Sequence, residues 1–152
     1  MRHGHLGVGD GAGMGPVNVR LSLFLPRDTA SVPMARRILS TTLRTAGVTD
    51  ECRADILLAL AEACANAVAH AKATESYGVT VEIDDSECQI EVVDDGPGFD
   101  YDPGPLHDEV PMLAESGRGL FIIRSLADDF DLLPNTPSGT LVRFAKRLDR
   151  PR

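Results

Sequence analysis

Glu62-Ala63-Cys64-Ala65-Asn66 is the stretch that decides the fold, because it places a carboxylate and a carboxamide four residues apart inside an apolar run. A spacing of four puts both side chains on one face of a helix. Apolar residues surround the pair on almost every side of that helix: Leu57, Leu58, Leu60, Ala61, Ala67 and Val68. A Glu and an Asn on a helix usually form a solvated stripe, but a polar pair in an apolar setting needs partners. We therefore predict that Glu62 and Asn66 face a cleft.

The segments before and around the pair predict one strand and two helices. In residues 17–25, Val or Leu occupies every second position, which is the two-residue period of a strand packed on one face. Residues 31–46 carry apolar side chains at intervals of three and four, which predicts an amphipathic helix. A second, more apolar helix over residues 50–71 holds the polar pair, and Asp50 is its predicted N-cap.

The segments after the pair predict two hairpins separated by a loop and a helix. Residues 100–115 are rich in Pro, Gly and acidic side chains without periodicity, and the length of this loop marks it as functional. The predicted elements are strands over 78–84 and 88–94, a helix over 119–128, and strands over 130–133 and 140–148. This order predicts the α+β class: a two-layer α/β sandwich whose mostly antiparallel, mixed sheet is covered by helices on one face.

The length and charge of the chain limit its organisation and its partners. A chain of 152 residues suits one domain, which we place at 17–148 between a Gly-rich tail (1–16) and a short C-terminal tail (149–152). The net charge of -8 argues against direct nucleic-acid binding and favours a basic protein partner. The sequence shows neither a signal peptide nor a membrane span, which predicts the cytoplasm. The three cysteines lack metal-ligand spacing and are predicted to be free thiols: Cys52, Cys64 and Cys88.

A carboxylate followed by two glycines predicts a site for a flat, amine-bearing ring. Asp94 ends a predicted strand and precedes a turn that contains Gly96 and Gly98. The carboxylate can accept a hydrogen bond from an exocyclic amine, and the glycines let a ring approach the backbone. This arrangement suits adenine, although the motif alone also fits an ordinary Asp-Gly turn. Thr140 could add a hydroxyl to the adenine side.

Two glycines that precede a predicted helix indicate a phosphate site. In Gly117-Arg118-Gly119, unpaired N–H groups and the positive end of the helix dipole would face the ligand. The glycines alone could equally serve a turn, and Arg118 either touches a terminal phosphate or extends into water. With phosphates there, the Asn66 oxygen could ligate Mg²⁺, and Glu62 could take or orient the proton of an incoming hydroxyl or water.

In this order, four motifs resemble the N, G1, G2 and final Gly-Thr motifs of the GHKL ATPase superfamily, which has the Bergerat or histidine-kinase-like ATP-binding fold: Glu62-x-x-x-Asn66, Asp94-x-Gly96-x-Gly98, Gly117-x-Gly119 and Gly139-Thr140. Within the superfamily, residues 62–71 and the run Gly117-Arg118-Gly119-Leu120 resemble the anti-sigma-factor serine/threonine kinases of the RsbW and SpoIIAB type. The likeness covers residues 17–148.

The resemblance implies a protein that binds ATP and Mg²⁺, holds a sigma factor inactive, and phosphorylates a small STAS-domain antagonist of that inhibition. Glu62 matches the catalytic base, Asn66 the Mg²⁺ ligand and Asp94 the adenine-binding carboxylate. The remaining implied nucleotide-binding residues are Gly96, Gly98, Gly117, Arg118, Gly119, Leu120 and Thr140. A homodimer is also implied, and the apolar surface of the first helix is its predicted interface.

Two other functions fit the same motifs. The first is a non-catalytic, nucleotide-binding module that sequesters a sigma factor or another basic regulator, suggested by the acidic charge and the irregular loop at 100–115. The second is a stand-alone ATPase, because hydrolases of the superfamily also place a Glu four residues before the Asn.

Overall fold

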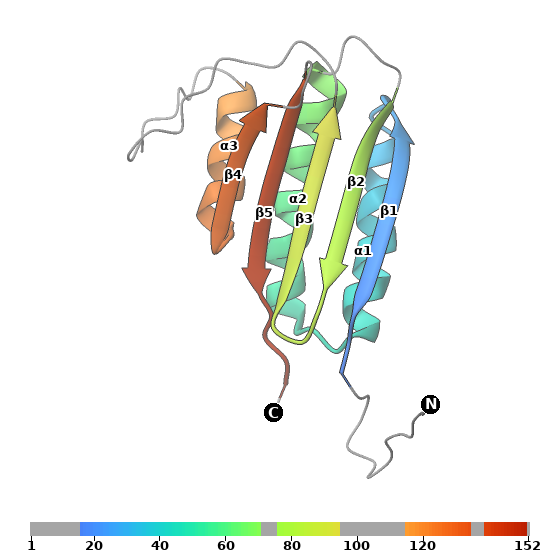
Figure 1. Ribbon diagram of the computed structural model, residues 1–152, viewed down its shortest axis with the longest axis vertical. Coiled ribbons are helices and arrows are strands. Elements are labelled where there is room, and N and C mark those ends of the chain that lie inside the picture. Colours follow the sequence, from blue (N-terminus) through green and yellow to red (C-terminus); the bar gives the residue numbers. More distant parts are fainter. Residues whose placement is uncertain (1–15, 71–75, 95–114, 135–138, 152) are drawn as a thin grey trace.

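The computed structural model describes residues 16–70, 76–94, 115–134 and 139–151, and shows five strands and three helices (Figure 1). The elements are β1 (Val19–Pro26), α1 (Ser31–Thr45), α2 (Asp50–His70), β2 (Ser76–Ile83), β3 (Glu87–Asp94), α3 (Glu115–Leu126), β4 (Asp129–Pro134) and β5 (Thr140–Arg147). The strands form one sheet in the order β1-β2-β3-β5-β4, and all four pairings are antiparallel. The predicted α+β sandwich is confirmed.

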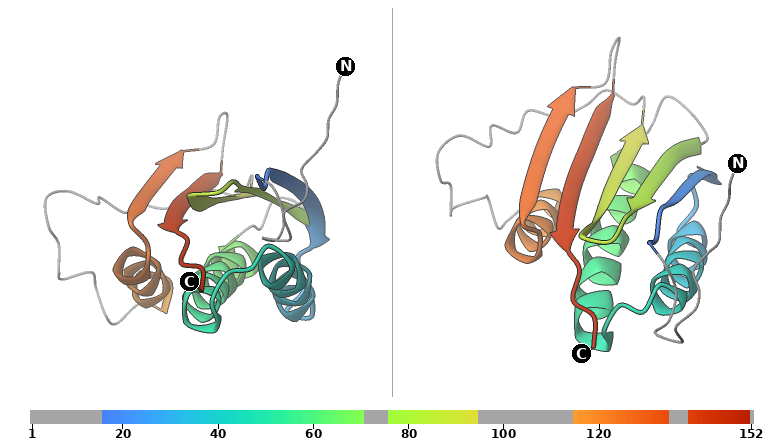
Figure 2. Two further views of the ribbon diagram at one scale, coloured as in Figure 1. Left: turned by 90° about the horizontal axis from the view of Figure 1, so that it is seen from below. Right: turned by 60° about the horizontal axis from the view of Figure 1, so that its bottom comes forward.

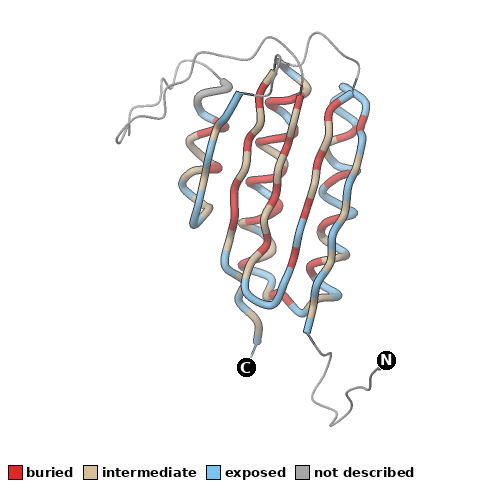
Figure 3. Tube along the Cα trace, viewed as in Figure 1, coloured by how far each residue is buried: buried red, intermediate tan, exposed pale blue. Residues whose placement is uncertain are grey.

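The three helices lie on one face of the sheet, and no helix of the described residues covers the other face (Figure 2). α2 packs between α1 and α3 and also contacts β3. Side chains in the central strands alternate between buried and half-buried (Figure 3), because every second residue points toward the helices. The core therefore lies between the helices and the inner face of the sheet.

The helices begin and end close to their predicted positions, with two differences. Thr49, and not Asp50, caps α2: its Oγ1 accepts a hydrogen bond from the Cys52 backbone N–H at 3.3 Å. α3 begins at Glu115, four residues before the predicted start, so that both glycines of the Gly117-Arg118-Gly119 run lie inside the helix. The prediction that the helix starts at Gly119 was wrong, because the packing of α3 against α2 outweighs the low helix preference of glycine. Within the described ranges, none of the helices combines the length and the apolar character that crossing a membrane requires.

Arg150 forms hydrogen bonds to two connecting segments at one end of the molecule. Its Nε donates to the Ala46 carbonyl at 3.2 Å, and its Nη atoms donate to the carbonyls of Asp84 and Asp85. Ala46 follows α1, whereas Asp84 and Asp85 belong to the turn between β2 and β3. One guanidinium thus joins the helical layer to the sheet.

The three thiols are expected to be unreactive in the folded protein. Cys52, Cys64 and Cys88 are free and buried, and burial raises the pKa of the Cys64 and Cys88 thiols to about 12. The raised pKa stabilises the fold below the unfolded pKa of about 8.5, and this stability is lost as pH rises toward 12. We expect negligible labelling by a thiol reagent at pH 8 without denaturant, and a free energy of unfolding in urea that falls above pH of about 9. Rapid labelling of the folded protein would contradict this prediction.

Candidate functional site

Glu62 and Asn66 lie on the side of α2 that meets α3, as their spacing predicts. A Cβ placed on Gly119 of α3 would lie 3.0 Å from Glu62 Oε1 and 3.8 Å from Asn66 Oδ1. Asn66 is buried, with 8% of its surface exposed, whereas Glu62 is half-buried. The polar pair therefore sits at the junction of two helices, with the carboxylate nearer to solvent than the amide.

The Asn66 amide has an unsatisfied donor. Its Nδ2 atom is buried and has no hydrogen-bond partner among the described residues. Leaving such a group unpaired costs about 1–3 kcal/mol, and buried polar groups in folded proteins are normally paired. An unpaired amide at this position fits a ligand: its nitrogen can donate to a phosphate oxygen, and its oxygen is a hard ligand of the kind that Mg²⁺ prefers.

Gly119 is explained by its approach to α2. A glycine inside a helix is less favourable than alanine by about 1 kcal/mol, so local helix preference does not account for it. Gly119 is buried, and a Cβ at this position would approach Glu62 Oε1 to 3.0 Å, which is tighter than ordinary van der Waals contact. Glycine therefore leaves the space that the Glu62 carboxylate occupies between the two helices.

Asp94 and Thr140 form a second polar pair at the ends of two neighbouring strands. They lie directly opposite each other in the pairing of β3 with β5, and their exposed fractions are 8% and 7%. Asp94 continues the alternation of buried residues in β3, so it points to the helical side of the sheet. Gly139, with φ of 104°, adopts the left-handed conformation that starts β5. Thr140 is therefore the cross-strand neighbour of Asp94, and its contact with adenine stays a prediction.

The remaining predicted residues are placed differently. Arg118 is exposed near the start of α3, where it is free to extend from the helix. Leu120 is 1% exposed and its side chain belongs to the hydrophobic core. Gly96, Gly98 and most of the loop predicted at 100–115 lie outside the described residues.

The sequence matches the family described as histidine kinase-like ATPase domain over residues 25–146. The chain belongs to this family. The serine-protein kinase RsbW of Bacillus velezensis is 32% identical to it over 139 residues, covering 85% of this chain and 86% of that protein. The serine-protein kinase RsbW of Listeria monocytogenes is 32% identical over 129 residues, covering 78% of this chain and 82% of that protein.

A solved structure has the same fold as this histidine kinase-like ATPase domain. The crystal structure of the RsbU and RsbW domains of a Mycobacterium tuberculosis protein matches 88% of this chain and 33% of that chain, with a TM-score of 0.67 and 23% sequence identity. The recognition of a histidine-kinase-like fold from the four motifs is therefore confirmed.

Behind the polar face of α2, this histidine kinase-like ATPase domain has a buried chain of hydrogen bonds that the sequence analysis missed. Ser31 Oγ donates to the Asp28 carbonyl at 2.8 Å and lies 2.6 Å from Tyr77 Oη. Ser31 already donates its hydroxyl proton to Asp28, so the Tyr77 hydroxyl is the donor between Tyr77 and Ser31. A further hydrogen bond joins Tyr77 to Cys64. Burial raises the pKa of Tyr77, so the phenol stays protonated. This series of hydrogen bonds fixes α2 against the starts of α1 and β2.

Arg27 adds a contact at the end of α2 that no motif indicated. Its Nε donates to the Val68 carbonyl at 2.9 Å, two residues after Asn66. The last carbonyls of a helix lack partners within the helix, and a cation is favourable at that end. Arg27 and the Ser31–Tyr77 chain therefore fix the helix that carries Glu62 and Asn66 from two sides.

Proposed function

We propose that this histidine kinase-like ATPase domain is an ATP- and Mg²⁺-dependent protein serine/threonine kinase of the cytoplasm. Its protein substrate would be a STAS-domain antagonist, and it would hold a sigma factor inactive until that antagonist competes. The observation that carries the proposal is the meeting of Glu62, Asn66 and Gly119 at one helix junction, where a buried amide lacks a partner among the described residues. The likeness to serine-protein kinases over more than three quarters of each chain supports a kinase over a hydrolase.

Each polar residue of the site has a distinct part in the proposed reaction. Asp94 would accept a hydrogen bond from the exocyclic amine of adenine, with Thr140 beside it. Asn66 would hold the Mg²⁺ ion, which neutralises phosphate charge when bound. Glu62, half-buried at the junction, would orient the serine or threonine hydroxyl of the substrate and take its proton. Phosphoryl transfer depends mainly on such positioning and charge stabilisation.

A direct test uses purified protein, labelled ATP, Mg²⁺ and candidate STAS-domain proteins. We expect label on a serine or threonine of one of them, and we expect Asp94→Asn to lose both ATP binding and transfer. Asp131→Asn is a matched control, because this carboxylate is exposed on β4. Measurable ATP binding without transfer to any STAS-domain protein would contradict the kinase proposal. If a sigma factor still bound and its release ignored ATP, the protein would be a binding module.

A further inference from the structure

The helix that carries Glu62 and Asn66 is apolar on its exposed side as well as on its buried side. Apart from Glu62, Cys64 and Asn66, residues 56–69 of α2 are all Ala, Leu, Ile or Val. On the outer side, Leu58 is 44% exposed. Burial of apolar surface has no direction, so it does not by itself select one rotation of such a helix about its axis. A directional contact is needed to fix that rotation.

Cys64 lies on the opposite side of α2 from the polar pair. Successive residues of a helix are turned by about 100°, so Glu62 and Asn66, two residues before and after Cys64, each lie about 160° from it. The pair faces α3, as the approach of Gly119 shows, and Cys64 is fully buried on the other side of the helix. A contact to Cys64 therefore holds α2 from behind the proposed site.

Tyr77 supplies this contact from the sheet. Its side chain is 2% exposed, and its hydroxyl lies 2.6 Å from Ser31 Oγ and forms a hydrogen bond with Cys64. Ser31 in turn donates to the Asp28 carbonyl at 2.8 Å, next to the start of α1. The Tyr77 hydroxyl is thus held by β2 and by α1, and it fixes the direction in which Cys64 points.

We propose that Tyr77, acting through Cys64, is a positioning residue for phosphoryl transfer: it sets the rotation of α2 about its axis and so the places of Glu62 and Asn66. Side chains end about 6 Å from a helix axis, so a rotation of about 10° moves them by about 1 Å. A displacement of this size in a catalytic group can cost about 100-fold in rate. The inference rests on the proposed roles of Glu62 and Asn66 in the kinase reaction.

Arg27 restrains the same helix in a different way. Its Nε donates to the Val68 carbonyl at 2.9 Å, and main-chain atoms lie only about 2 Å from the axis of a helix. A contact so close to the axis restrains movement along the helix more than rotation about it. The two contacts are therefore complementary, and the rotation depends on Tyr77.

Variants of Tyr77 and Cys64 test this role. Cys64→Ala and Cys64→Ser differ only by a hydroxyl group, and serine can keep the hydrogen bond to Tyr77. We expect Tyr77→Phe and Cys64→Ala each to lower the single-turnover transfer rate by roughly 10-fold, and Cys64→Ser to stay within about twofold of the wild type. The double variant should be no slower than Tyr77→Phe, because both changes remove the same contact. Circular dichroism checks that each variant is folded.

The side-chain amide of Asn66 reports the rotation without any ligand. In NMR spectra of the isotope-labelled full chain without nucleotide, we expect the Asn66 amide signals to shift in Tyr77→Phe and Cys64→Ala and to stay in place in Cys64→Ser. Asn66 is on the far side of α2, so these shifts require the helix to move. A role limited to stability would lower the midpoint of urea unfolding and leave the signals and the transfer rate unchanged.

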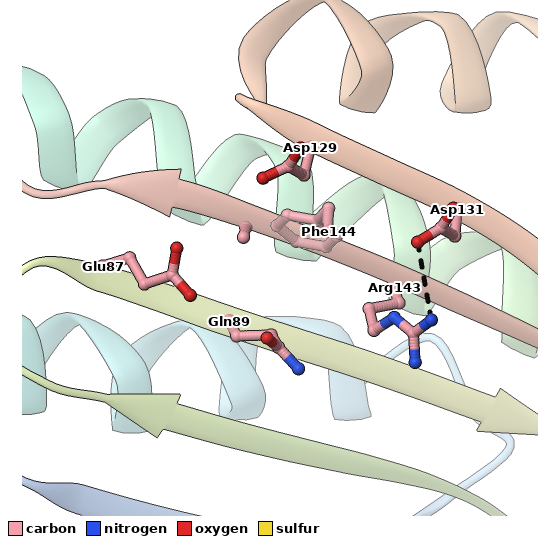
Figure 4. Close-up of a pocket in the computed structure, with 7 residues that line it drawn as sticks. Glu87, Gln89, Asp129, Asp131, Arg143 and Phe144 are labelled. Carbon is pink, nitrogen blue, oxygen red and sulfur yellow. Dashed lines mark hydrogen bonds and ion pairs between the residues drawn. The ribbon is translucent and has the colours of Figure 1, made fainter.

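Two control variants lie in the sheet. Cys88→Ala removes a buried sulfur from β3, as Cys64→Ala does from α2. Gln89→Ala changes a hollow of about 210 Å³ that is also bordered by Glu87 and Asp129 (Figure 4). Gln89 alternates with the buried residues of β3, so the hollow lies on the face of the sheet that the helices do not cover. Both variants should keep the wild-type transfer rate and the wild-type Asn66 signals.

The outcomes separate this inference from the kinase proposal. Wild-type transfer and unshifted Asn66 signals in Tyr77→Phe and Cys64→Ala would overturn the positioning role, even where Glu62→Gln abolishes transfer. Equal losses in Cys64→Ser and Cys64→Ala would also overturn it, because the hydrogen bond would then be irrelevant. If the kinase proposal fails instead, the wild type transfers no label, and the Asn66 signals alone decide whether Tyr77 sets the rotation of α2.

Discussion

Glu62→Gln is expected to slow phosphoryl transfer to a protein substrate by roughly 100- to 10,000-fold, the contribution that a general base makes. The amide has the size of the carboxylate but cannot take the proton of the incoming hydroxyl. ATP affinity is expected to stay within about threefold of the wild type, because Asn66 and Asp94 remain. Single-turnover transfer from labelled ATP and calorimetric titration with ATP measure the two effects separately.

Glu51→Gln is the control for this variant, since Glu51 is an exposed carboxylate in the first turn of the same helix. It should leave both measurements unchanged. If Glu62→Gln retained transfer at the wild-type rate, Glu62 would have no role as base, while Asn66 could still hold the metal. If ATP binding fell together with transfer, Glu62 would instead be part of the nucleotide site.

Gly119→Ala is expected to lower transfer by roughly 10- to 100-fold without destabilising the protein. The new Cβ would lie 3.0 Å from Glu62 Oε1, the mobile end of the side chain, so the carboxylate moves aside. A displacement of about 1 Å in a catalytic group can cost 100-fold in rate. Replacing glycine inside a helix meanwhile favours folding by up to about 1 kcal/mol. Transfer kinetics and urea unfolding should therefore change in opposite directions.

Ser125→Ala, on the exposed side of α3, is the matched control and should leave the transfer rate unchanged. Combining Gly119→Ala with Glu62→Asp should recover part of the activity relative to Gly119→Ala, because the shorter side chain withdraws the carboxylate from the added methyl group. A wild-type rate in Gly119→Ala would show that the close approach of the helices does not set the position of the carboxylate.

Periodicity and spacing were sufficient to predict the elements and the main polar residues. The spacing of Glu62 and Asn66 fixes them on one helical face, and the structure places that face where α2 meets α3. Asp94 at the end of a strand was equally predictable. Its position opposite Thr140 requires β5 to pair with β3, a long-range contact that local sequence does not encode.

Two kinds of feature could not be read from the sequence. The early start of α3 is contrary to the low helix preference of glycine. Only the close approach of α3 to Glu62 explains why residue 119 is a glycine. A row of apolar positions that runs from Phe24 to Leu133 on the sheet face opposite the helices depends on the register of five strands. Phe24 and Leu133 are separated by more than a hundred residues, so no short motif connects them.

The place of β5 in the sheet has a consequence for the synthesis of the chain. β5 lies between β3 and β4, yet it follows both in sequence. β4 is at the edge and pairs with β5, so it has no sheet partner on the ribosome until β5 has emerged. Asp94 and Thr140 also meet only when this last strand inserts. A partly made chain therefore lacks the polar corner that we assign to adenine, and ATP binding reports that the domain has been completed.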